Sequence, residues 1–211
     1  MIEYLEHKPI QTAELENKAE IKQHNPTPEE IENTFKMYKT AFGLTEEELV
    51  QKRIIDAGCG ENALFIRYAV EHGAQNTTGV DIHFTETALT DEKLKNHLLE
   101  VSIENLPLKD VDLIVSYASV ATNPDIALPQ ALHSMVVSLK PGGEIRIYPV
   151  GQSETLEGVK EHRKMLEGIL KTLDSDINFT SRTIEKDIIT PDGKTWSKDV
   201  LIIHKNELQN P

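Results

Sequence analysis

The spacing of the hydrophobic residues changes partway along this chain. In its first part, apolar side chains recur every three or four positions along one segment, which predicts an amphipathic helix. These side chains are Ile31, Phe35, Tyr38 and Phe42. Just before them, Thr27 supplies a hydroxyl for an N-cap and Pro28 suits the first helical position. A second helix is predicted over residues 43–52, where Thr45 and Glu48 have the spacing of a capping box.

After residue 52, short apolar segments alternate with amphipathic ones, as strands and helices do. The predicted strands are residues 53–58, 77–82, 110–118 and 144–150, followed by β-rich stretches at 177–189 and 194–205. The predicted helices are residues 63–73, 91–101, 126–143 and 154–173. This alternation predicts an α/β fold: a doubly wound, mostly parallel sheet with helices on both faces. We expect seven strands in this sheet, of which these strand ranges account for six. The turn sequence TPDGK at residues 190–194 predicts that the last two strands form an antiparallel hairpin.

The same change of pattern suggests how the chain is organised. We expect residues 1–52 to form an N-terminal helical cap or extension and residues 53–211 to form the α/β domain, within one compact unit. The N-terminus has charges throughout and does not resemble a secretory signal, and no apolar run reaches the roughly 18 residues of a membrane span. We therefore expect a cytoplasmic protein without a membrane segment.

Charge and cysteine content narrow the choice of partners. The 211 residues include 22 Lys and Arg against 35 Asp and Glu, which gives a net charge of −13. Such a chain repels polyanions, so we expect no general affinity for nucleic acid or for anionic membranes. The single cysteine, Cys59, rules out an internal disulfide framework and a Cys-rich zinc site, and it fits a reducing cytosol. We expect no metal site.

The stretch RIIDAGCGENALF, residues 53–65, places an acid and two glycines where the first strand turns into a helix. Gly58 and Gly60 allow backbone angles that other residues resist and let a ligand approach the main chain. Asp81 ends the second strand, 25 residues after Asp56, where an acid can bind both hydroxyls of a ribose. Asp56 itself has no evident use beside a pyrophosphate but suits a positive amino group. The pattern therefore indicates a nucleoside joined to an amino acid.

With these motifs the chain, from Arg53 to about Pro149, resembles the class I S-adenosylmethionine-dependent methyltransferases. The matching segments are IIDAGCGEN, TTGVDI, ENLPLKDVDLIVSYASV and LKPGGEIRIYP. The resemblance covers roughly half of the chain. It implies the Rossmann-like fold, S-adenosyl-L-methionine as the cofactor, and methyl transfer by direct displacement at the sulfonium methyl.

The resemblance also implies which residues hold the cofactor. The glycine loop would line the methionine part, with Asp56 near the amino group directly or through a water. The loop residues are Asp56, Ala57, Gly58, Cys59 and Gly60. Asp81 would bind the ribose hydroxyls, and Ile82 would pack on the adenine ring. We expect Cys59 to be a small packing residue and not a nucleophile.

The adenine edge departs from the family pattern. Ser102 stands where these enzymes usually have an acid that binds the adenine amino group. Ser102 can still hydrogen-bond, the Ile103 backbone can read the ring edge, and Glu104 is a nearby acid that can substitute. Ser116 and Tyr117, at the end of the next strand, would face the sulfonium and the methyl group that is transferred.

The sequence says less about the methyl acceptor than about the cofactor. Methyl transfer needs mainly alignment of the acceptor and exclusion of water, so few catalytic groups are required. The segment SYASVATN lacks the Asn or Asp, two prolines and aromatic residue of enzymes that methylate exocyclic amino groups of bases. Methylation of a cytosine ring carbon needs a cysteine nucleophile, and Cys59 lies in the cofactor loop. We therefore expect a small-molecule acceptor. The candidate catalytic residues are Tyr117, His83 and His133.

Three alternatives remain open. The aromatic side chains of the first helix can line the acceptor pocket, although we favour their packing on the core. The chain can be a non-catalytic, methyltransferase-like protein that binds the cofactor or regulates a partner, as the departures at Asn62 and Ser102 suggest. It can also be an NAD-dependent oxidoreductase, but the shortened glycine pattern, the acid at Asp56 and the C-terminal hairpin argue against this.

Overall fold

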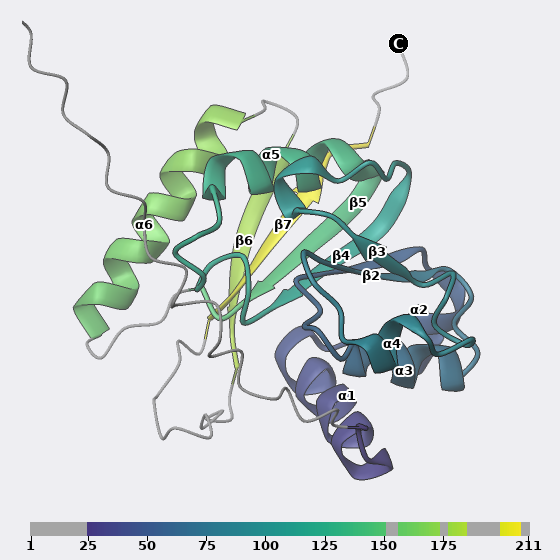
Figure 1. Ribbon diagram of the computed structural model, residues 1–211. Coiled ribbons are helices and arrows are strands. Elements are labelled where there is room, and N and C mark those ends of the chain that lie inside the picture. Colours follow the sequence, from purple (N-terminus) through teal and green to yellow (C-terminus); the bar gives the residue numbers. More distant parts are fainter. Residues whose placement is uncertain (1–24, 151–155, 174–176, 185–198, 208–211) are drawn as a thin grey trace, which may run out of the picture.

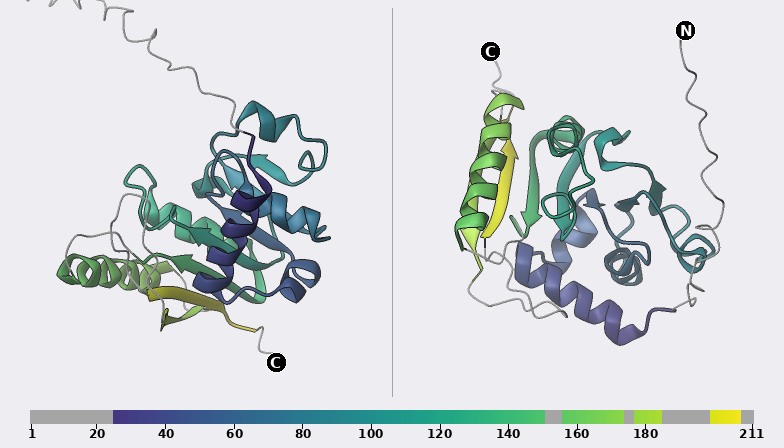
Figure 2. Two further views of the ribbon diagram at one scale, coloured as in Figure 1. Left: turned by 90° about the horizontal axis from the view of Figure 1, so that it is seen from below. Right: turned by 60° about the vertical axis from the view of Figure 1, so that its left-hand side comes forward.

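The computed structural model describes residues 25–150, 156–173, 177–184 and 199–207. They form a seven-stranded sheet with helices on both faces (Figures 1 and 2), which confirms the predicted fold class. The strands are β1 Ile54–Ala57, β2 Thr77–Asp81, β3 Leu98–Glu100, β4 Val111–Tyr117, β5 Leu139–Tyr148, β6 Ile177–Thr183 and β7 Asp199–Lys205. The helices are α1 Pro28–Phe42, α2 Glu46–Gln51, α3 Leu64–Glu71, α4 Glu86–Leu89, α5 Leu128–Ser138 and α6 Leu156–Leu173, with a short 3-10 helix, η2, at Ile103–Asn105.

The strands lie in the order β3-β2-β1-β4-β5-β7-β6. The first five are parallel, whereas β7 runs antiparallel to both β5 and β6. The predicted antiparallel pairing at the end of the sheet is thus confirmed, while the predicted turn at residues 190–194 lies outside the described residues. The strand order reverses between β1 and β4, which is where ligands bind in sheets of this kind.

Alternation along the central strands divides the interior into two cores. Successive side chains of a strand point to opposite faces, so Ile54 packs in one core and Ile55 in the other. In β4, Leu113 and Val115 belong to the core under α1 and α3, and Ile114 belongs to the core under α5 and α6. The central strands are therefore buried on both faces, as a parallel sheet requires.

The first two helices form where their caps predict them. In α1 the Thr27 hydroxyl accepts a hydrogen bond from the Glu30 backbone N–H at 3.3 Å, and the Glu30 carboxylate accepts one from the Thr27 N–H at 2.7 Å. Thr45 and Glu48 form the same capping box at α2. The aromatic side chains Phe35, Tyr38 and Phe42 are 3%, 4% and 3% exposed, which confirms that they pack on the core.

One predicted helix was wrong, and a second was wrong in extent. Residues 91–101 do not form a helix, because Leu98, Leu99 and Glu100 pair with β2 as the edge strand β3. Leu94 is buried in the core, and its four-residue spacing from Leu98 imitated a helical repeat. The helix predicted over 126–143 ends at Ser138, because Leu139 already pairs with Val111 as the start of β5.

Backbone carbonyls of the first helix are bound by arginines of the sheet. Arg146 of β5 donates to the Phe42 carbonyl at 3.2 Å and to the Glu48 carboxylate at 3.1 Å. Arg182 of β6 donates to the Ala41 carbonyl at 2.7 Å. These bonds satisfy carbonyls at the end of α1 that have no partner within the helix, and they fix α1 and α2 to the strands.

Replacing Arg146 with methionine should destabilise the protein by about 2 kcal/mol, since hydrogen bonds to a charged group that is largely buried are lost. The Arg146 side chain is 12% exposed, whereas that of Lys36 on the outer face of α1 is 63% exposed. Lys36→Met is therefore the control, with an expected change below about 0.5 kcal/mol. Urea unfolding of both variants measures the difference, and equal losses would contradict the role of Arg146.

Candidate functional site

The carboxyl ends of β1, β2 and β4 meet at one edge of the sheet. Asp56 lies next to the end of β1, Asp81 ends β2 and Tyr117 ends β4. The sequence predicted these three residues as parts of one site, and the strand order places their strands side by side. The turn between β1 and α3 borders the same edge.

The glycine loop is held in shape by β2. The Gly58 N–H donates to the Val80 carbonyl at 2.8 Å, and the Gly60 N–H donates to the Asp81 carboxylate at 2.9 Å. Both glycines have positive φ angles, 76° and 77°. A Cβ on Gly58 would collide with the Ser119 side chain, whereas a Cβ on Gly60 would have nothing within 4 Å. The loop therefore has a closed side at Gly58 and an open side at Gly60.

A cavity of about 100 Å³ lies beside this loop. Its wall combines the end of β2, η2 and the loop between β4 and α5. The lining residues are Gly58, Asp81, Ile82, Ser102, Ile103, Glu104, Ser119, Asn123 and Ile126. Six of the twelve predicted cofactor residues are thus brought together here. Ile82 is 70% exposed, so an apolar face is available for a flat ligand beside the Asp81 carboxylate.

The acids at this cavity are already oriented by the protein. The Asp81 carboxylate accepts hydrogen bonds from the backbone of Gly60 at 2.9 Å and of Ile82 at 2.8 Å. Glu104 accepts one from the Ser102 hydroxyl and one from the Ala127 N–H at 2.9 Å, just before α5. The serine that replaces the expected acid therefore positions the neighbouring acid.

Asp56 lies beneath the site and is fully buried. The Tyr38 hydroxyl is 3.1 Å and 3.0 Å from its two carboxylate oxygens, to which it donates. Burial raises the pKa of Asp56 to about 8, and the nearby charge of Asp81 adds to the shift, while the Tyr38 hydrogen bond opposes it. Burial and the Asp56 charge raise the pKa of Tyr38, so that its hydroxyl stays a donor.

Aromatic rings continue from Tyr38 to the end of β4. Tyr38 stacks on Phe65 and on Tyr117, with ring centroids 4.3 Å and 5.2 Å apart, and the Tyr117 and Tyr148 centroids are 5.4 Å apart. Burial raises the pKa of Tyr117 to about 12, so it is a neutral phenol near pH 7. The residue that follows it, Ala118, has a left-handed φ of 53°, a strained geometry that is common at functional sites.

Other predicted residues lie away from the open part of the site. Ser116 is fully buried, and its hydroxyl accepts a hydrogen bond from the Val120 N–H at 3.2 Å, so it supports the loop after β4. His83 and His133 are exposed, and neither lines the cavity beside the glycine loop or the larger cavity described below. Cys59 packs against Gly79, and burial raises the pKa of its thiol, in keeping with a packing residue.

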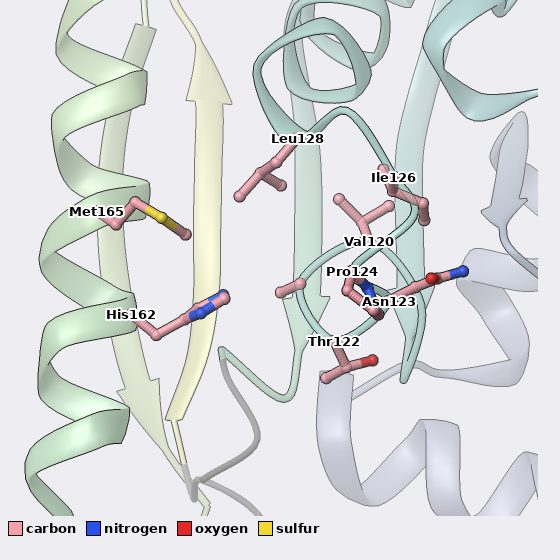
Figure 3. A pocket seen from close by; sticks show the side chains of 9 residues that line it. Val120, Thr122, Asn123, Pro124, Ile126, Leu128, His162 and Met165 are labelled. Atoms are coloured by element: carbon pink, nitrogen blue, oxygen red, sulfur yellow. The ribbon is translucent and has the colours of Figure 1, made fainter. Parts of the chain in front are cut away.

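A second, larger cavity of about 340 Å³ lies between the loop after β4 and α6 (Figure 3). Its lining residues are Val120, Ala121, Thr122, Asn123, Pro124, Ile126, Leu128, His162 and Met165. Asn123 and Ile126 also line the smaller cavity, so the two are neighbours on either side of one loop.

Sequence reasoning missed three structural features of the candidate site and its surroundings. The contact of Tyr38 with Asp56 joins elements 18 positions apart, and no local pattern reveals it. The placement of Ser119 over Gly58 depends on the course of the loop after β4. His162 lies on an amphipathic helix, where a single histidine among charged neighbours gives no signal of its own.

The known proteins that this chain resembles in sequence are named as methyltransferases. Residues 54–143 match the profile of a family described as a methyltransferase domain. A malonyl-[acyl-carrier protein] O-methyltransferase from Pectobacterium atrosepticum is 31% identical over 121 residues, which are 57% of this chain and 47% of the relative. A ribosomal protein L11 methyltransferase from Teredinibacter turnerae is 32% identical over 108 residues, 48% of this chain and 34% of the relative. The chain thus spans half or less of these curated relatives.

A solved structure shows the same fold. A Listeria monocytogenes protein named as a candidate S-adenosylmethionine-dependent methyltransferase superimposes with a TM-score of 0.55 at 17% identity. The match covers 83% of this chain and all of that one. At this identity the likeness concerns the fold, which agrees with the sheet order found here.

Gly58→Ala should destabilise the protein by roughly 3 kcal/mol, because a strained φ is combined with a collision against Ser119. Gly73→Ala is a matched control, since Gly73 also has a positive φ, 88°, but open space where its Cβ would lie. It should cost about 1–2 kcal/mol. Urea unfolding measures both, and equal losses would mean that Ser119 does not close the loop at Gly58.

Asp56 should make the unfolding free energy fall as the pH rises from about 4 to about 8. In this range the folded state keeps the Asp56 proton that the unfolded state releases, because burial raises the pKa from 3.8 to about 8. The limiting slope is about 1.4 kcal/mol per pH unit. The stability of wild type relative to Asp56→Asn should therefore decrease between pH 4 and 8 and level off above pH 8.

The Asp112→Asn variant is a control with the opposite pH dependence of the unfolding free energy. Burial acts to raise the pKa of Asp112, but the hydrogen bonds from the Lys140 ammonium and the Arg53 N–H outweigh it and lower the pKa. The stabilisation by Asp112 is therefore present above pH 4 and is lost as the pH falls through the lowered pKa. Its difference from wild type should be constant between pH 5 and 8. If the Asp56→Asn difference is constant over the same range, Asp56 is not protonated in the folded state.

Proposed function

We propose that this protein binds S-adenosyl-L-methionine at the carboxyl ends of β1, β2 and β4 and transfers its methyl group to a small molecule. The match of residues 54–143 to a family described as a methyltransferase domain supports the proposal, as does the strand order of the sheet. The observation that carries the proposal is the joint position of the Asp81 carboxylate, the open side of Gly60 and the exposed Ile82. An acid at a strand end, beside a glycine turn, suits a ribose.

The residues of the smaller cavity fit the adenosine part of such a cofactor. Asp81 would accept hydrogen bonds from the ribose hydroxyls, and Ile82 would pack on the adenine ring. Glu104 would accept a bond from the adenine amino group in place of the family's usual acid, with Ser102 holding it in position. Ile103, whose backbone would read the edge of the adenine ring, lies in the same wall.

The methionine part needs more room than the smaller cavity gives. Small-molecule sites have volumes of roughly 300–1,000 Å³, and the cavity at Asp81 has about 100 Å³. The Ser119 side chain fills the space over Gly58. Binding would therefore require the loop after β4 to move away from the glycine turn, and the Tyr38 hydroxyl would separate the cofactor's amino group from Asp56.

The bound cofactor would supply the reactive methyl group on its sulfonium. The chain would align the acceptor with the methyl group and exclude water, and these two effects account for much of the catalysis of such a displacement. Tyr117 lies at the end of β4, and its ring contacts the aromatic rings of Tyr38 and Tyr148. As a neutral phenol it can donate a hydrogen bond to an acceptor, but it is not a base near pH 7.

A small molecule is the proposed acceptor. The curated relatives are named for different acceptors, an acyl group on a carrier protein and a ribosomal protein, so their names do not choose between classes. The net charge of −13 opposes nucleic acids. In the described part of the chain, each helix is too short or too polar to cross a bilayer.

A second candidate function is that of a methyltransferase-like protein that binds the cofactor, or regulates a partner, without turnover. Two contacts favour it: Ser119 closes the loop at Gly58, and Tyr38 engages both oxygens of Asp56. An enzyme yields S-adenosylhomocysteine with some acceptor, whereas a binding protein does not.

Asp81→Ala should weaken S-adenosylmethionine binding by about 100-fold, because two hydrogen bonds to a charged acceptor are lost. The control is His83→Ala, an exposed neighbour outside the cavity wall, which should bind as wild type does. Calorimetric titration measures both, with NADH as a further ligand that should not bind. Absence of sulfonium-cofactor binding by wild type, or binding of NADH in its place, would overturn the proposed function.

A further inference from the structure

The larger cavity has the size of a small-molecule site. Its volume of about 340 Å³ lies at the lower end of the usual range. Figure 3 shows His162 and Met165 extending from α6 toward the loop that carries Val120 and Thr122. Two separate parts of the chain thus enclose it, the loop after β4 and one face of α6.

The wall of this cavity is uncharged. No Lys, Arg, Asp or Glu is among the described residues that line it. Taking a charged group out of water is costly unless a partner compensates it. The wall offers apolar side chains with three polar groups, the Thr122 hydroxyl, the Asn123 amide and the His162 imidazole. Such a wall suits an uncharged, mostly apolar molecule with a single polar group.

His162 provides a position for that polar group. Its Nε2 atom is buried and has no hydrogen-bond partner among the described residues. Buried polar atoms are nearly always paired, so an exception in a cavity wall points to a missing ligand group. Burial lowers the pKa of His162, with the Ala121 backbone carbonyl opposing the shift, so the imidazole is neutral near pH 7. A neutral imidazole can exchange a hydrogen bond with a hydroxyl.

The cavity lies next to the proposed cofactor site. Asn123 and Ile126 line both cavities, so an occupant of the larger one is one loop away from the adenosine-binding wall. We propose that the cavity between the loop after β4 and α6 is a second small-molecule site, which binds an uncharged apolar molecule with one hydroxyl that hydrogen-bonds to His162.

Phenol and toluene test the assignment, because they have nearly the same shape and differ in one hydroxyl. Binding to the full chain is followed by saturation-transfer NMR titration, with benzoate as the charged counterpart. Phenol should bind with a dissociation constant on the order of 1 mM, as expected for a small fragment. Toluene should bind several-fold more weakly, and benzoate should not compete.

Two variants locate the binding. Met165→Trp should fill the cavity and weaken phenol binding at least tenfold. Met165 is 47% exposed at the rim, so the fold should tolerate the change. Val137→Trp is the matched control, on an exposed part of α5 outside the cavity wall, and should bind phenol as wild type does. His162→Phe keeps a ring of similar shape and should abolish the preference for phenol over toluene.

The outcomes separate the cavity assignment from the proposed function. Titration of S-adenosylmethionine into the same samples should give unchanged affinity in Met165→Trp. Loss of phenol binding with retained cofactor binding supports the assignment of the cavity as a separate small-molecule site. Equal phenol binding by Met165→Trp and Val137→Trp, tight benzoate binding, or no saturable phenol binding by wild type would overturn the cavity assignment alone. Failure of wild type to bind the cofactor would overturn the proposed function.

Discussion

The hydrogen bond from Tyr38 to Asp56 is the contact on which the arrangement of this site depends. It joins the middle of α1 to the end of β1 across the buried side of the glycine turn. A buried carboxyl without a partner would be strongly unfavourable, so the hydroxyl must be present for the acid to remain there. The stack of Tyr38 on Phe65 and Tyr117 holds the hydroxyl in place. The acid at the strand end and the aromatic face of α1 therefore form one structural element.

The loop after β4 is the second constraint, because it serves both cavities. Its start is fixed by the Ser116 hydroxyl under Val120 and by the strained backbone of Ala118. Beyond that point Ser119 closes the glycine turn, and Asn123 and Ile126 separate the two cavities. A short segment without regular structure thus determines how much space each ligand has, as loops on a rigid sheet commonly do.

Most of the fold could be predicted from the sequence, because the relevant signals are local. The N-cap at Thr27, the capping box at Thr45, the glycines after β1 and the acid at the end of β2 can all be recognised from a few neighbouring positions. The edge strand β3 could not be, since Leu98 and Leu99 owe their conformation to pairing with Gly79 and Val80. In the site, Asp81 was predicted from its place at the end of a strand, and its neighbours in the cavity wall were implied by the resemblance to methyltransferases; the structure brings them together. The partners of Asp56, Gly58 and the larger cavity come from distant elements, so their contacts depend on tertiary packing.

The match to known methyltransferase domains begins at residue 54, but the physical unit does not. A fragment that starts there would leave the Asp56 carboxyl facing a gap where the Tyr38 hydroxyl had been, and it would expose Phe65 and Tyr117 to water. It would also remove the main-chain carbonyls that Arg146 and Arg182 bind. The shortest fragment able to fold on its own therefore has to begin before α1, at the cap formed by Thr27.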